Sequence, residues 1–82
     1  MEDSRLAIIA IIVENKNSVE KINELLHSCA PFIIGRMGMP YPKKNVSIIT
    51  VIVDAPQDII STLSGKLGQI KDVSIKTTYS KV

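Results

Sequence analysis

The longest uninterrupted apolar run, Leu6 to Val13, constrains the fold more than any other part of this sequence. It has eight residues, none of them polar, and five of them are β-branched. Eight residues is short for a core helix, and β-branching favours the pleated conformation, so the run predicts a strand. A strand with one face in water would alternate apolar and polar residues, and this run does not. We therefore expect both of its faces to be covered.

Two amphipathic helices are predicted by apolar residues at helical spacing. The first extends from about Ser18 to Ser28, with a capping box in which Asn17 is the N-cap and Glu20 its partner. The second opens at Pro56, whose missing N–H costs nothing in a first turn. Gly68 is predicted to end it, in a left-handed backbone conformation. The apolar stripes consist of Val19, Ile22, Leu25, Leu26 and Cys29 in the first helix, and Ile59, Ile60, Leu63, Leu67 and Ile70 in the second.

Three more strands are predicted downstream of the first helix. Phe32 to Met39 is strand-like, and its two glycines indicate a bulge or the close approach of another backbone. A turn over Pro40 to Asn45 returns the chain to Val46–Val53, which is mainly apolar on both faces. Val73 to Thr78 alternates, with Val73 and Ile75 inward, as an edge strand with one wet face should.

The order strand, helix, strand, strand, helix, strand predicts an α+β fold of the ferredoxin-like βαββαβ type. We expect a single domain over residues 1–82, with a four-stranded antiparallel sheet and both helices on one face. Right-handed crossovers place the first and third strands in the middle, and these are the strands that are apolar on both faces. A patch of that kind is rare on a soluble monomer. We therefore expect a homo-oligomer, dimer or tetramer, formed through the open sheet face.

Composition narrows the function classes only slightly. The net charge of +2 is too small to argue for nucleic acid, and one cysteine excludes an internal disulfide framework. The acidic start, Met1 to Ser4, lacks the basic flank of a signal peptide, and an eight-residue apolar run cannot span a bilayer. We expect a cytoplasmic protein without direct nucleic-acid or membrane contact.

One segment, Leu63 to Ile70, reads Leu-Ser-Gly-Lys-Leu-Gly-Gln-Ile and is followed by Val73 to Thr77. With Asn23–His27 and Arg36–Pro40, it resembles the iron-only hydrogenase system regulator family. The resemblance covers nearly the whole chain. It implies an oligomeric fold of the ligand-sensing type, related to ACT domains and to the C-terminal domain of the nickel-responsive repressor.

The chain departs from both of those relatives. Amino-acid-binding ACT domains usually have a glycine after the first strand, where this chain has Glu14 to Asn17. The nickel repressor uses several histidines and a cysteine as ligands, and this chain has one His and one Cys. There is no separate DNA-binding segment, so a role in transcription would have to act through a partner.

Five residues are the candidates for ligand or interface contact: Arg36, Gly38, Ser64, Gly65 and Lys66. Arg36, on a largely apolar strand, can meet a carboxylate, phosphate or carbonyl, and its alternative role is to discourage edge aggregation. A glycine inside a helix, as at Gly65, lowers helix stability by about 1 kcal/mol relative to alanine. Close approach of another backbone or of a ligand would offset that loss. A solvated surface is the alternative for the helix residues.

The sequence gives little support for a metal site, a cofactor site or a catalytic site. His27 and Cys29 are two residues apart on a helix and cannot chelate one ion together, although a site shared across subunits stays open. The chain has no nucleophile paired with a base, and we expect no catalytic residue, resident metal or cofactor. The favoured function is a non-enzymatic regulatory module that senses a small ligand at a subunit interface. The alternatives are a scaffold protein in metallo-enzyme maturation, without a small ligand, and a small dimeric α+β barrel enzyme.

Overall fold

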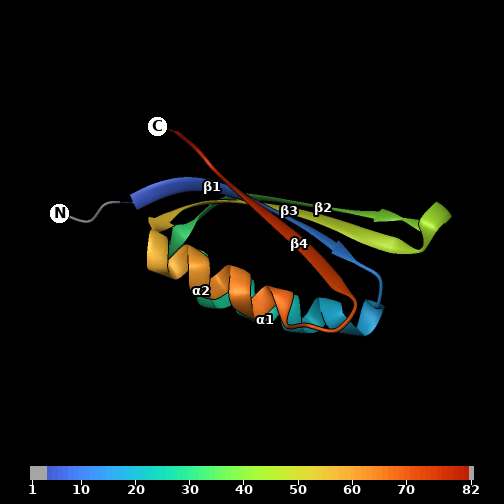
Figure 1. The fold of residues 1–82 in the computed structure, drawn as a ribbon. Helices are drawn as coiled ribbons and strands as arrows, with labels where there is room; N and C mark the ends of the chain where they lie inside the picture. The colour runs from blue at the N-terminus through green and yellow to red at the C-terminus, as the bar shows by residue number, and fades with distance from the viewer. Residues whose placement is uncertain (1–3, 82) are drawn as a thin grey trace.

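The computed structural model describes residues 4–81, in which two helices cover one face of a four-stranded antiparallel sheet (Figure 1). The acidic start at residues 1–3 lies outside the described residues. The elements are β1 (Ser4–Val13), α1 (Val19–Ser28), β2 (Ile33–Tyr41), β3 (Val46–Pro56), α2 (Gln57–Gly68) and β4 (Val73–Tyr79). Short 3₁₀ turns lie at Lys16–Ser18, Ala30–Phe32 and Pro42–Lys44.

The strand order is β2-β3-β1-β4, which is the order of the ferredoxin-like fold. The prediction that the first and third strands are central is confirmed. β1 pairs with β3 along its whole length, from Ser4 opposite Pro56 to Val13 opposite Ser47. β4 alternates between half-buried and exposed residues, as predicted for an edge strand.

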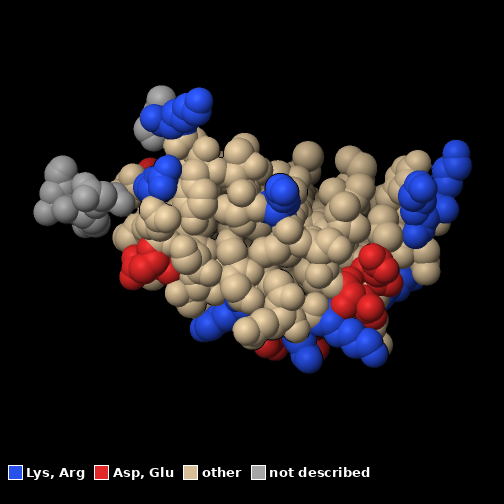
Figure 2. Space-filling model, viewed as in Figure 1, with Lys and Arg blue, Asp and Glu red and all other residues tan. Residues whose placement is uncertain are grey.

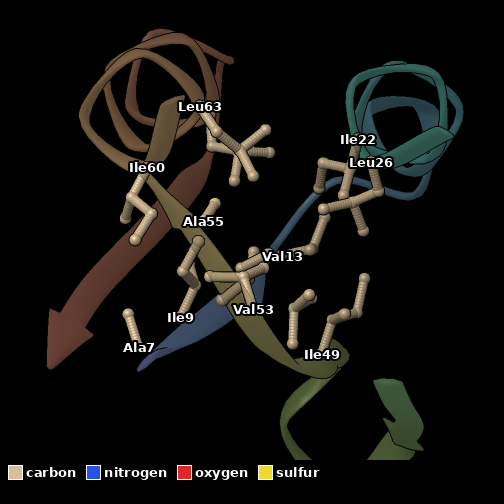
Figure 3. Packing of buried hydrophobic residues seen from close by; sticks show 13 residues of the cluster. Ala7, Ile9, Val13, Ile22, Leu26, Ile49, Val53, Ala55, Ile60 and Leu63 are labelled. Atoms are coloured by element: carbon tan, nitrogen blue, oxygen red, sulfur yellow. The ribbon is translucent and has the colours of Figure 1, made fainter. Parts of the chain in front are cut away.

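The core lies between the sheet and the helices. Figure 3 shows Ile22 and Leu26 of α1, and Ile60 and Leu63 of α2, extending toward the side chains of β1 and β3. Alternate residues of the two central strands form the sheet side of this core, where they pack against the helices. The buried strand residues are Ala7, Ile9, Ile11, Val13, Ile49, Val51, Val53 and Ala55.

The predicted capping box at the start of α1 is wrong. The N-cap is Ser18, which makes no side-chain capping bond, and Asn17 instead donates its N–H to the Asn15 side chain at 2.9 Å. The Ser18 hydroxyl donates to the Lys71 carbonyl at 2.8 Å, and Ser18 is buried. A long-range bond to the loop before β4 therefore replaces the local cap, and sequence spacing alone does not reveal such a bond.

The left-handed conformation predicted for Gly68 is also wrong, although α2 does end there. No glycine within residues 4–81 has a positive φ. The left-handed residues are Asn45 (φ 56°), which closes the β2–β3 hairpin, and Asp72 (φ 61°), which precedes β4. Asn and Asp tolerate this region better than other side chains do, so the reversals use them in place of glycine.

Two element boundaries differ from those expected. Pro40 was predicted in the turn but lies within β2, because an edge strand tolerates the missing N–H. Pro56 ends β3 and is the N-cap of α2, one residue before the helix, and so is not in its first turn. The predicted bulge is confirmed by the register shift between Ile33 and Gly35.

Candidate ligand and interface surfaces

The face of the sheet opposite the helices is apolar, and we call it the open sheet face. Ile8, Met37 and Ile52 expose between 36% and 60% of their surface there. The register makes these side chains neighbours across three strands, since Ile8 lies opposite Ile52, and Met37 lies opposite Thr50 of the same strand, β3. The other large exposed hydrophobics of β1 and β2 are Ile12, Ile34, Met39 and Tyr41.

The apolar area stops at β4, whose outward residues are Ser74, Lys76 and Thr78. Asp54 is a second exposed charge at the far end of β3. In Figure 2 uncharged side chains occupy most of the upper middle of the molecule, where the sheet lies, and charges gather toward the ends and the helices. The open sheet face therefore combines a large apolar centre with a polar margin, the usual anatomy of a protein interface.

Arg36 lies on the other side of the sheet from this patch, at its β2 edge. It is paired opposite Val51, which is fully buried beneath the helices. Its guanidinium donates to the Asn23 side-chain oxygen in α1. This contact between the edge strand and α1 forms part of an open groove of about 660 Å³, which we call the edge groove.

One polar stripe of α1 supplies the wall of the edge groove. Glu20, Asn23, Glu24 and His27 have the spacing i, i+3, i+4, i+7 and line the groove together with Arg36. Arg36 has no carboxylate partner in the described part of the chain, since its one side-chain bond goes to a neutral amide. Its remaining donors can reach a carboxylate or phosphate in two-point geometry.

Two of the five candidates, Gly38 and Arg36, lie on the same surface. Both residues line a smaller groove of about 220 Å³ at the β2 edge, next to Val19 at the start of α1. A Cβ placed on Gly38 would meet no atom within 4 Å, so the glycine leaves open space there. Arg36 is the one lining residue that the two grooves share.

Ser64, Gly65 and Lys66 are on a different surface, away from Arg36. Ser64 is half-buried, and its hydroxyl lies 2.8 Å from the Thr77 hydroxyl of β4, so its side chain is part of the packing between helix and sheet. Gly65 is exposed, with open space where a Cβ would lie. Lys66 is exposed on a groove between the two helices.

Among the residues that the structure describes, neither His27 nor Cys29 belongs to a cluster of possible metal ligands. No group of three or more His, Cys, Asp or Glu residues within residues 4–81 could hold an ion. Cys29 is half-buried against the core, and His27 is exposed on the edge groove. The hydrogen bond between Arg36 and Asn23, and the place of His27 in the same groove, were missed from the sequence. The stripe that Asn23 and His27 share on α1 was visible, but only the topology shows that this stripe faces β2.

Comparison with known proteins decides the family. The family model "TM1266-like: Iron-only hydrogenase system regulator, putative" matches residues 5–77. The chain belongs to this family. The solved structure of uncharacterized protein TM1266 from Thermotoga maritima has 38% identity, a TM-score of 0.92, and covers 96% of this chain and 100% of that one. The resemblance noted in the sequence is thereby confirmed.

Two more distant structures agree on the fold alone. The C-terminal domain of the MgtC protein from Mycobacterium tuberculosis has 10% identity and a TM-score of 0.75, over 99% of this chain and 95% of that one. The divalent ion tolerance protein CutA1 from Ehrlichia chaffeensis has 11% identity and a TM-score of 0.53, over 96% and 84%. A comparison with curated proteins gave no match. Neither helix described here is long and apolar enough to cross a membrane.

Proposed function

We propose that this protein is a non-enzymatic, cytoplasmic regulatory module that assembles through its open sheet face and senses a small anionic ligand at the β2 edge. The family, described as a regulator of an iron-only hydrogenase system, supports the regulatory part. A closer relationship to ACT domains, which sense ligands through an oligomeric fold of this type, is part of the same proposal.

The observation that carries the assembly is the exposure of Met37, Ile8 and Ile52 on one continuous face. A second copy is the simplest cover, because its own open face is equally apolar and two identical faces can pack about a twofold axis. Lys76 and Asp54, of opposite sign, lie at different margins of that face and can pair across such an axis. Burial of this apolar area would drive association.

The observation that carries the ligand is the Arg36 guanidinium, held by Asn23 and free of carboxylate partners in residues 4–81. It lies on β2, the same strand that contributes Met37 and Met39 to the open sheet face. A ligand bound to Arg36 would therefore act on the strand that carries part of the proposed interface. A carboxylate or phosphate is the group that fits the guanidinium.

A thermal-shift screen against amino acids, nucleotides and divalent metal ions tests the ligand. We expect one class of anionic compound to raise the melting temperature by several degrees, because a ligand that binds only the folded state stabilises it. Arg36→Met should abolish that shift, whereas Lys43→Met, which removes one charge at the hairpin tip, should keep it. Absence of a shift with every class, or an undiminished shift in Arg36→Met, would contradict ligand sensing at this groove and favour the scaffold alternative.

A further inference from the structure

The helix layer carries a second surface, which the proposed function does not use. A groove of about 710 Å³ lies between α1 and α2. Three lysines line it: Lys21 on α1, Lys66 in the last turn of α2, and Lys71 in the loop before β4. We call this surface the helix groove.

The positive charges that line the helix groove outnumber the negative ones. None of the three ammonium groups has an ion pair or a side-chain hydrogen bond within the described residues. Glu24 is the one carboxylate in the lining, and it too is without such a partner. Three cations around one anion, on two helices and the loop before β4, leave a local excess of positive charge in a protein whose net charge is only +2.

Two apolar residues contribute to the lining of the helix groove. Leu25 of α1 and Ile70 after α2 are half-buried, pack against the core and still contribute to the lining. Water-exposed apolar side chains surrounded by cations match a partner that presents apolar residues along one stripe and acidic residues beside it.

From these features we propose that the helix groove binds an acidic amphipathic segment, most simply a helix, of a partner protein. A small anion fits less well, because no hydrogen bond within the described residues holds any of the three lysine side chains in place, whereas Asn23 holds Arg36 in the edge groove. Small-molecule sites usually depend on a few polar groups held in fixed positions. Figure 1 shows both helices on one side of the sheet, and residues of these helices line the helix groove. The groove is therefore on the opposite side from the open sheet face, so partner binding and self-assembly can occur together.

The test uses the full chain and a synthetic helical peptide with leucines along one face and glutamates flanking them. The controls are a scrambled peptide of the same composition, a Glu→Lys version, and inorganic pyrophosphate. Binding is followed by backbone amide shifts in NMR. We expect saturable binding of the acidic amphipathic peptide alone, with the largest shifts at Leu25, Ile70 and their neighbours. Equal binding of the scrambled peptide or of pyrophosphate at these residues would overturn the proposal in favour of unspecific anion attraction.

Charge-reversal variants give the second arm. Lys21→Glu with Lys66→Glu should weaken peptide binding at least about tenfold, equivalent to about 1.4 kcal/mol. Lys43→Glu with Lys44→Glu changes the net charge equally at the hairpin tip and should leave binding within about twofold. Equal losses in both double variants, or no binding by the wild-type protein, would overturn the proposal. The oligomeric state, measured on the same samples, reports separately on the proposed assembly.

Discussion

Ile8 and Ile52 lie directly opposite each other in β1 and β3, and both project from the open sheet face. Their chain neighbours Ile9 and Val51 are also paired, yet both are fully buried under the helices. Two adjacent positions on one strand therefore serve different surfaces, one the core of the molecule and the other the proposed interface.

Lysine substitutions on the buried side of the sheet and on the open sheet face should have different consequences. Ile9→Lys, like Ile49→Lys, buries an unpaired charge in the core and should cost several kcal/mol, which unfolds the chain. Ile52→Lys places the charge on the open sheet face and should dissociate the oligomer while the monomer stays folded. Circular dichroism and sedimentation of both variants separate the outcomes. A folded, fully assembled Ile52→Lys protein would show that this face is not the interface.

Gly65→Ala reports on the outer surface of α2 through the sign of its effect. Open space surrounds the position within one chain, so alanine should raise helix propensity and stabilise by about 0.5–1 kcal/mol if the face is solvated. If another subunit or a ligand approaches there, the methyl group should weaken assembly or ligand response instead. Urea unfolding with sedimentation distinguishes the cases, and Gly65→Leu should exaggerate whichever effect is found.

Ser18→Ala should destabilise the fold by about 1 kcal/mol, because it leaves the Lys71 carbonyl without its buried hydroxyl donor. Ser28→Ala is a suitable control, since Ser28 is exposed and its hydroxyl contacts only near neighbours among the described residues, the Leu25 carbonyl and the Cys29 sulfur. Urea denaturation measures both. A larger loss in Ser28→Ala than in Ser18→Ala would contradict the importance assigned to the long-range bond.

Leu67→Ala tests the packing of α2 on the sheet. Leu67 is fully buried, and its truncation should cost about 2–5 kcal/mol, through lost apolar burial and the cavity left behind. Thermal unfolding measures the loss. Leu25→Ala removes the same atoms from a half-buried site and should cost less.

The sheet order was predictable because two independent patterns agreed on it. The apolar runs at Leu6–Val13 and Val46–Val53 marked the central strands, and the order of elements placed the same strands in the middle. Local capping was not predictable, because Ser18 bonds to Lys71, a residue far along the chain. β2 also extends beyond its predicted end, through Pro40, because an edge strand tolerates the missing N–H of a proline and a central strand does not.

The candidate surfaces were predicted less completely. Arg36 was singled out by its place among apolar residues, but its contact with Asn23 depends on which stripe of α1 faces β2. Ser64 was a candidate for contact with a ligand or another subunit, yet it is half-buried and its hydroxyl lies beside that of Thr77. Helical spacing gives the angle between two residues around the helix axis, but it does not show which of them faces a neighbouring strand.

Sedimentation of the wild-type protein at micromolar concentration tests the central claim most directly. An open sheet face that carries Ile8, Met37 and Ile52 at 36% to 60% exposure should be covered by another copy, so we expect a dimer or a larger assembly. A monodisperse species of 9.0 kDa would contradict the account, since the apolar face would then be exposed to water in the native state.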